Sequence, residues 1–187
     1  MTDVVDDQVA RLLRPGERVL WRGRPIPRRF ILRGSPLVIP FTIAWFAFAI
    51  FWEASVLSSR APGLFALWGV PFILIGAYIT VGRFFVAWRE AQRTAYVLTD
   101  QRILVAGGAF TTRIQELSLR TLPSPTLDQG VDGVGTITFG PTFPYASWLP
   151  AGWPMMRAMS PSFTTIADAS SVFRRIDEAV VDARSQP

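Results

Sequence analysis

Two long runs of the chain contain no charged residue. They cover residues 34–52 and 61–82 and are 19 and 22 residues long. A hydrocarbon core of about 30 Å is crossed by roughly 20 helical residues, and helices of soluble proteins are seldom apolar on every side over that length. Each run therefore predicts a membrane-spanning helix. The residues between the runs, 53–60, are enough only for a turn, so we expect an antiparallel hairpin.

Local signals refine the two spans. Ser35 and Pro36 supply an N-cap hydroxyl and a proline at the first helical position of the first span. Pro71 lies inside the second span and predicts a kink. Small residues on both spans allow the two backbones to approach closely. They are Ala44, Ala47 and Ala49 on the first span and Gly69, Gly76 and Thr80 on the second.

Arginines flank the spans on one side of the predicted bilayer. Six arginines and no acid lie between residues 18 and 33, and three arginines with one acid lie between residues 83 and 93, whereas the connecting segment has one of each. Because positively charged segments resist translocation, this pattern predicts a multi-pass protein of the cell (inner) membrane with both termini in the cytoplasm. A cleaved signal peptide is rejected, because the charged leader is longer than a whole signal sequence of about 15–30 residues.

From Thr94 onward the pattern changes to short strands separated by turn residues. Strands are predicted over residues 95–98, 103–106, 117–120, 126–129 and 134–139. Apolar residues at helical spacing from Val172 to Ala183 then predict a C-terminal helix, capped by Asp168 or Ser170. A single amphipathic helix needs an apolar surface to cover, and a small, strongly bent sheet or half-open barrel supplies one.

The leader predicts two further elements. Apolar residues at helical spacing between Val5 and Leu13 predict a short amphipathic helix. Val19 and Trp21 alternate in a short extended piece, which is expected either to pair with the later sheet or to lie at the level of the lipid headgroups. The chain is thus divided into an N-terminal cytoplasmic segment at 1–34, a transmembrane hairpin at 35–93 and a cytosolic domain at 94–187.

Composition removes several kinds of chemistry. All 19 basic residues are arginine, and the chain has no lysine, histidine, cysteine or asparagine. Zinc fingers, disulfides, cysteine nucleophiles, Schiff-base lysines and histidine bases are therefore excluded. We expect no catalytic residue, no metal site and no cofactor.

The basic charge belongs to the membrane flanks. Residues 1–93 contain 12 arginines and 6 acids, a net charge of +6, while residues 94–187 contain 7 arginines and 8 acids, a net charge of −1. A nucleic-acid partner is therefore not expected. Anionic lipid headgroups are candidate partners of the leader arginines. The same arginines also set the orientation of the spans in the membrane, and that role requires no particular lipid. These candidates are Arg22, Arg24, Arg28, Arg29 and Arg33.

An apolar, proline-rich loop is predicted over residues 141–161. A loop of this length inside a domain is uncommon unless it binds a partner or covers an open core. Two interpretations stay open, a lid tucked over the barrel mouth and an exposed surface that contacts the cytoplasmic leaflet or a protein. The candidate contact residues are Phe143, Tyr145, Trp148, Leu149, Trp153, Met155 and Met156.

Several segments carry a resemblance to a known family. They are the leader LRPGERVLWRGRP at 13–25, the run RTAYVLTDQRIL at 93–104, GTITF at 135–139, and 163–166 before the last helix. In this order they resemble bacterial pleckstrin-homology-like (PH-like) domain proteins, whose membrane members have a similar leader, two spans and a cytosolic PH-like domain. The resemblance implies a bent sheet of about seven strands capped by a C-terminal helix. It supplies no catalytic residue. Phosphoinositide-binding PH domains have a basic cluster around the first hairpin, whereas this hairpin offers only Arg102 beside Asp100, which does not favour phosphoinositide recognition.

Three classes of function follow. The preferred one is a non-enzymatic integral membrane protein whose PH-like domain recognises another membrane protein, a cytosolic protein or a peptide at the inner face of the membrane. The alternatives are a membrane enzyme using carboxylates such as Asp100, Asp128 and Asp132, and a subunit of a larger transport complex. Turn aspartates usually accept local backbone hydrogen bonds, and uncharged spans lack the groups that transport paths use. Homo-oligomerisation stays open.

Overall fold

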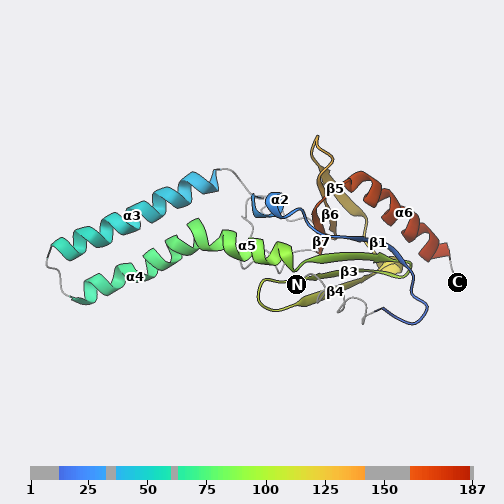
Figure 1. The fold of residues 1–187 in the computed structure, drawn as a ribbon, viewed down its shortest axis with the longest axis horizontal. Coiled ribbons are helices and arrows are strands. Elements are labelled where there is room, and N and C mark those ends of the chain that lie inside the picture. The colour runs from blue at the N-terminus through green and yellow to red at the C-terminus, as the bar shows by residue number, and fades with distance from the viewer. Residues whose placement is uncertain (1–12, 33–36, 60–62, 142–160, 186–187) are drawn as a thin grey trace.

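The computed structural model describes residues 13–32, 37–59, 63–141 and 161–185. It is an α+β protein with two long apolar helices and two antiparallel sheets, as the sequence predicts at this level. The long helices form an arm on the left of Figure 1, and the sheets with the last helix lie at the other end of the molecule.

The elements follow one another along the chain without a repeat. They are β1 Val19–Gly23, α2 Pro27–Leu32, α3 Val38–Ser58, α4 Gly63–Ala77, a π-helical turn Tyr78–Gly82, α5 Arg83–Gln92, β2 Ala95–Thr99, β3 Arg102–Gly107, β4 Arg113–Ser118, a 3₁₀ turn Leu119–Thr121, β5 Pro125–Gln129, β6 Gly135–Phe139, β7 Ser162–Ile166 and α6 Ala169–Ser185.

Helix α3 continues beyond the end that the charge pattern predicted. It includes Glu53 and the five residues after it, so the assignment of residues 53–58 to a turn and the prediction of two spans without an internal charge are both wrong. Glutamate has good helix propensity, and the helix ends only where the Ser59 N–H donates to the carbonyls of Ser55 and Val56. The antiparallel hairpin itself is confirmed by the packing of α3 on α4.

The second long helix continues from the arm into the sheet region. Helix α4, the π-helical turn and α5 form one helix over Gly63–Gln92, and Pro71 lies inside α4. The helix changes direction between α4 and α5 (Figure 1), where the π-helical turn interrupts the α-helical hydrogen-bond pattern. No loop separates the apolar helix from the part of the chain that meets the sheets.

The first sheet takes its strands from both sides of the hairpin. Its order is β1-β2-β3-β4, with every neighbouring pair antiparallel. Strand β1 comes from the leader and pairs Arg22 with Val97 and Gly23 with Tyr96, so of the two interpretations of this piece, pairing with the later sheet is confirmed. The whole arm is thus inserted between two neighbouring strands of one sheet.

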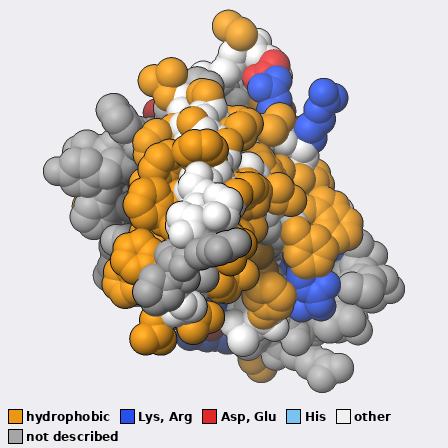
Figure 2. Space-filling model, turned by 90° about the vertical axis from the view of Figure 1, so that its left-hand side faces the viewer, with side chains coloured by type: hydrophobic (Ala, Val, Ile, Leu, Met, Phe, Trp, Pro, Cys, Tyr) orange, Lys and Arg blue, Asp and Glu red, His pale blue; other side chains and the backbone are white. Residues whose placement is uncertain are grey.

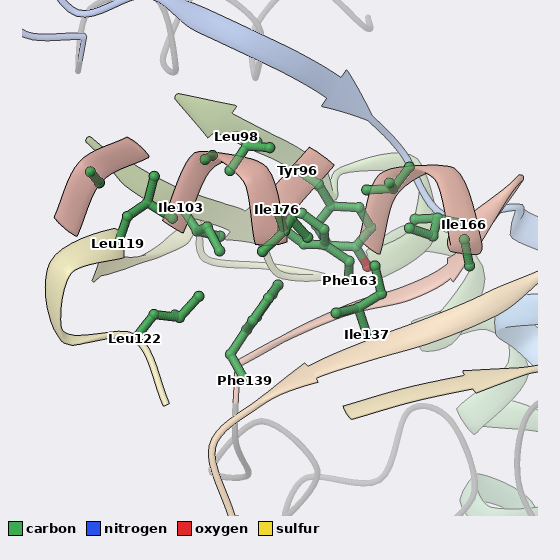
Figure 3. Close-up of a cluster of buried hydrophobic side chains, with 14 residues drawn as sticks. Tyr96, Leu98, Ile103, Leu119, Leu122, Ile137, Phe139, Phe163, Ile166 and Ile176 are labelled. Atoms are coloured by element: carbon green, nitrogen blue, oxygen red, sulfur yellow. The ribbon is translucent and has the colours of Figure 1, made fainter. Parts of the chain in front are cut away.

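The second sheet and the last helix enclose the main core. The order is β5-β6-β7, again antiparallel. Figure 3 shows apolar side chains from both sheets meeting the inner face of α6, where Ile176 lies. The Phe163 ring lies 5.4 Å from Trp21, 4.9 Å from Tyr96 and 5.0 Å from Phe139 between ring centroids, so the leader contributes to the same core. The C-terminal helix covers the sheets as predicted, while the PH-like fold stays a prediction.

Several boundaries differ from the prediction. Strand β4 ends at Ser118, in the middle of the predicted segment 117–120, because the chain turns into a 3₁₀ helix there. Helix α2 was not predicted, although Pro27 at its start is a common first helical residue. At the start of α6 the Asp168 carboxylate accepts the Ser171 hydroxyl, and its carbonyl accepts backbone N–H groups. The predicted leader helix, the Ser35–Pro36 cap and the contact residues of the 141–161 loop lie outside the described residues.

Candidate functional site

The hairpin interface is built around glycines that face larger side chains. A Cβ atom added to Gly69 would collide with the Glu53 carboxyl, and one added to Gly76 would lie 2.7 Å from the Phe46 ring. Ala49 is buried as predicted, whereas Ala44 and Ala47 are exposed, so their predicted place at the interface is wrong. The glycines let the two backbones approach closely enough to enclose large side chains from α3.

Two polar groups lie between the helices. Glu53 is 9% exposed, and its Oε2 has no hydrogen-bond partner. Nearer the sheets, the Thr80 hydroxyl donates to the Thr42 carbonyl across the hairpin at 3.1 Å. A buried polar oxygen without a hydrogen-bond partner raises the free energy of the folded state. The niche beside Gly69 that receives the Glu53 carboxyl is therefore a constrained part of the hairpin.

The outer surface of the hairpin is apolar. Large exposed side chains point away from both helices, among them Phe41, Phe48, Phe51, Leu64, Leu67, Trp68 and Leu74. Figure 2 looks at the molecule from the hairpin end and shows hydrophobic side chains over most of this face, with arginines at its margin. An exposed apolar surface of this kind is uncommon on a soluble monomer. Both helices are long and apolar enough to cross a membrane.

Arg83 marks the point where the apolar helix reaches the sheet region. It is 3% exposed, and its guanidinium carbon lies 4.3 Å from the centre of the Phe84 ring, a cation–π geometry. Its Nε has no hydrogen-bond partner. This arginine was predicted as a flanking charge, and the structure places its side chain inside the fold.

A buried ion pair ties the leader to the first sheet. Arg102 donates from Nε and Nη2 to both carboxylate oxygens of Glu17, at 2.9 and 2.8 Å, and from Nη1 to Glu116 at 2.6 Å. The Glu17 side chain is 0% exposed and that of Arg102 is 7% exposed. Thr99 and the backbone N–H of Arg14 also donate to Glu17. Each oxygen of the buried carboxylate is therefore hydrogen-bonded, and two separate parts of the chain are joined.

This geometry changes the acid–base behaviour of the pair. The hydrogen bonds from Arg102 lower the pKa of Glu17 from 4.5 to about 2, against the opposing effect of burial. In return, the hydrogen bond with Glu17 raises the pKa of Arg102 above its ordinary value. Both groups are charged at neutral pH, and the pair has a structural character because both side chains are shielded from solvent.

The leader arginines proposed as lipid contacts lie on two elements. Arg22 and Arg24 are exposed at and just after β1, and Arg28 and Arg29 are exposed on α2. Arg29 forms an ion pair with Asp132 in the β5–β6 turn, which joins α2 to the second sheet. Arg33 lies outside the described residues. Helix α2 packs against α5, so its arginines lie at the end of the sheet region from which the hairpin leaves (Figure 1).

Two of the three aspartates of the enzyme alternative accept hydrogen bonds from the backbone. Asp100 accepts the Arg18 N–H at 3.0 Å, and Asp132 accepts the Val134 N–H at 3.3 Å in addition to its ion pair with Arg29. Asp128 is an exposed residue of β5. Across the described parts of the chain, no group of three or more acidic, histidine or cysteine side chains is arranged to hold a metal ion.

Comparison with known protein families, with curated proteins and with solved structures finds no match to this chain.

Two structural roles were not predicted from the sequence. The charge pattern places Glu53 in a turn, although its position directly after an apolar run is a signal that the helix continues past it. The partnership of Glu17 with Arg102 had no sequence signal, because the two residues are 85 positions apart and meet only when β1 pairs with β2.

Proposed function

We propose that the chain is a non-enzymatic integral membrane protein that holds a PH-like domain at the cytoplasmic face of the inner membrane for recognition of a protein or peptide. The observation that carries the proposal is the continuous helix over Gly63–Gln92, whose apolar part leads without a linker into α5. A domain attached in this way stays next to the bilayer surface. Both termini are cytoplasmic in this proposal, because the arginine-rich segments flank the same end of the hairpin.

The architecture of the sheets supports the PH-like part of the proposal. In the part of the chain that the structure describes, seven strands form two antiparallel sheets that are followed by a C-terminal helix over the core, which agrees with what the sequence resemblance implies. Strand β1 lies before the hairpin and β2 after it, so the membrane anchor interrupts the domain between its first two strands. Two backbone connections therefore hold the domain at the bilayer.

Strand β4 is the recognition surface we propose. It is the last strand of its sheet, and most of its side chains are exposed. An end strand presents backbone N–H and C=O groups that pair with an added extended peptide, while alternate side chains select its sequence. Ile114 is an exposed apolar residue on this strand.

Topology is tested by thiol labelling, because the native chain has no cysteine. Single variants Ser58→Cys, Ser124→Cys and Ser185→Cys are treated in intact cells with a membrane-impermeant maleimide. We expect only the Ser58→Cys variant to react, since Ser58 is the last residue of α3, at the end of the hairpin away from the arginine-rich segments. All three variants should react after the membrane is permeabilised. Labelling of Ser124→Cys or Ser185→Cys in intact cells would contradict the proposed orientation.

Recognition is tested with a photo-crosslinking residue in place of Ile114, in cells that express the full chain. We expect an adduct of one discrete mass from this site, and none from the same residue in place of Glu178, an exposed position on α6. An adduct at twice the 20.8 kDa mass of the chain would indicate self-association instead of a separate partner. Crosslinking to lipid alone would contradict recognition of a protein at β4.

A further inference from the structure

Three exposed aromatic side chains lie where the hairpin enters the sheet region. Phe85 and Trp88 project from α5 with exposed fractions of 58% and 46%, and Phe110 in the loop after β3 is 65% exposed. The centres of the Phe85 and Trp88 rings are 6.2 Å apart. We call these three residues the junction patch. None of them takes part in the main core or in the hairpin interface.

The loop that carries Phe110 is held on α5 by arginines. Arg89 Nε donates to the Ala109 carbonyl at 3.0 Å, and Arg93 Nη1 donates to the same oxygen at 3.4 Å. The Arg89 guanidinium carbon also lies 6.0 Å from the centre of the Phe110 ring. Gly108 before it has φ +144°, and a Cβ there would collide with the Thr111 carbonyl. The turn therefore requires glycine, and Phe110 has a defined place beside the helix.

The position of the patch relative to the bilayer follows from the continuous helix. The uncharged run ends at Gly82, and Phe85 and Trp88 follow it by about 4.5 and 9 Å along the helix axis. Because α5 differs in direction from α4 (Figure 1), the distances of these residues from Gly82 along the bilayer normal are shorter. The headgroup layer on each side of the hydrocarbon core is roughly 5–8 Å thick. Figure 1 shows that α5 and the turn between β3 and β4 lie at the end of the sheet region that faces the hairpin.

We propose that the junction patch inserts into the headgroup region of the leaflet that the hairpin enters, with phospholipid as its occupant. Aromatic rings favour this layer, and the neighbouring Arg89 and Arg93 complement anionic phosphate groups. A protein partner is disfavoured, because α5 has no linker that would carry the patch away from the lipid surface. The inference rests on the proposed membrane insertion and adds a second contact, which fixes the orientation of the sheets on the bilayer.

The test measures immersion depth by electron paramagnetic resonance of nitroxide labels on single cysteines. The full chain is reconstituted in vesicles of phosphatidylcholine with one quarter phosphatidylglycerol. The labels replace Phe110, Ile50 in the hairpin, and Val181, an exposed apolar residue on α6. Helix α6 lies at the opposite end of the molecule from the arm (Figure 1). Collisions with oxygen report lipid exposure, and collisions with a water-soluble nickel chelate report water exposure.

We expect the oxygen-to-nickel accessibility ratio of the Phe110→Cys label to be at least twofold above that of Val181→Cys and below that of Ile50→Cys. A ratio equal to that of Val181→Cys overturns the inference, and so does low accessibility to both reagents, which indicates contact with protein. If the Ile50→Cys label is also exposed to water, the proposed membrane insertion itself fails. The two failures are thus distinguishable.

A second variant tests the part played by the arginines. Arg89→Gln with Arg93→Gln removes both side chains that hold the Ala109 carbonyl, and we expect the Phe110→Cys label to lose at least half of its excess accessibility to oxygen. The near-ultraviolet circular dichroism of the domain serves as the check on folding. An unchanged label environment in a folded double variant would overturn the role of these arginines as the support of the patch.

Discussion

Replacing Arg102 by methionine is expected to destabilise the sheet domain by about 3–5 kcal/mol. The substitution leaves the fully buried Glu17 carboxylate without its counter-charge. The expected loss exceeds that of a surface ion pair because the bidentate contact is shielded from solvent. The measurement is the unfolding free energy of the full chain in detergent micelles, followed by tryptophan fluorescence, since Trp21 lies in the core beside Phe163.

The matched control is Arg175→Met, which removes an exposed arginine from α6. It is expected to change the unfolding free energy by less than about 0.5 kcal/mol. If the two variants were equally stable, the ion pair would contribute nothing to the attachment of the leader. Glu17→Gln provides a second check, because it keeps the size of the side chain and removes its charge.

Acid is expected to remove the same stabilisation. The pKa of Glu17 is about 2 in the folded protein, below its ordinary value of 4.5, so the unfolded chain binds the proton more readily. The contribution of this group is therefore complete above about pH 4.5 and is lost as the pH falls through about 2. Between pH 6 and pH 3 the wild-type chain should lose about 2 kcal/mol from this group, and Arg102→Met should lose correspondingly less.

The hairpin could be predicted because its signal is local. Two uncharged runs separated by a short polar segment predict two long helices that run antiparallel, without any knowledge of tertiary contacts. The error at Glu53 has a physical origin. A charge count places a glutamate outside a span, whereas the helix accommodates it in the space left by Gly69, and that space exists only after the two helices pack.

The strands were predictable in kind and less so in extent. Alternation and turn residues located β2, β3, β5 and β6 within one or two residues, because those signals act between neighbours. Strand β4 was misplaced, since its exposed positions give little hydrophobic contrast. Helix α2 was missed because its one buried residue, Phe30, gives no periodic pattern over six residues.

The candidate surfaces were the least predictable part. Phe110 follows two glycines and an alanine in a segment with no periodic signal, and its relation to Arg89 depends on how the β3–β4 turn packs against α5. The leader arginines were identified by type, yet the ion pair of Arg29 with Asp132 needed the approach of α2 to the second sheet. Contacts between distant segments can be predicted only when the fold is known, whereas the type of each element can be predicted from the local pattern of residues.

Replacing Gly69 by leucine is expected to destabilise the hairpin by about 1–3 kcal/mol. A Cβ at this position collides with the Glu53 carboxyl, so either that carboxyl must leave its niche or the two helices must separate. The measurement is the loss of helical circular dichroism of the full chain during titration of mild micelles with dodecyl sulfate. Gly63→Leu is the matched control, because a Cβ at Gly63 has no neighbour within 4 Å.

The double variant Glu53→Ala with Gly69→Leu separates steric conflict from a general intolerance of leucine in α4. Removing the carboxyl opens the space that the new side chain needs, and it also removes the buried oxygen that has no partner. We therefore expect the double variant to recover at least half of the stability that Gly69→Leu alone removes. Such a recovery would show an energetic coupling between two residues in contact. Additive effects of the two substitutions would mean that Glu53 does not occupy the Gly69 niche in the membrane. The close packing of α3 on α4 would then have to depend on the Phe46–Gly76 and Thr42–Thr80 contacts nearer the sheets.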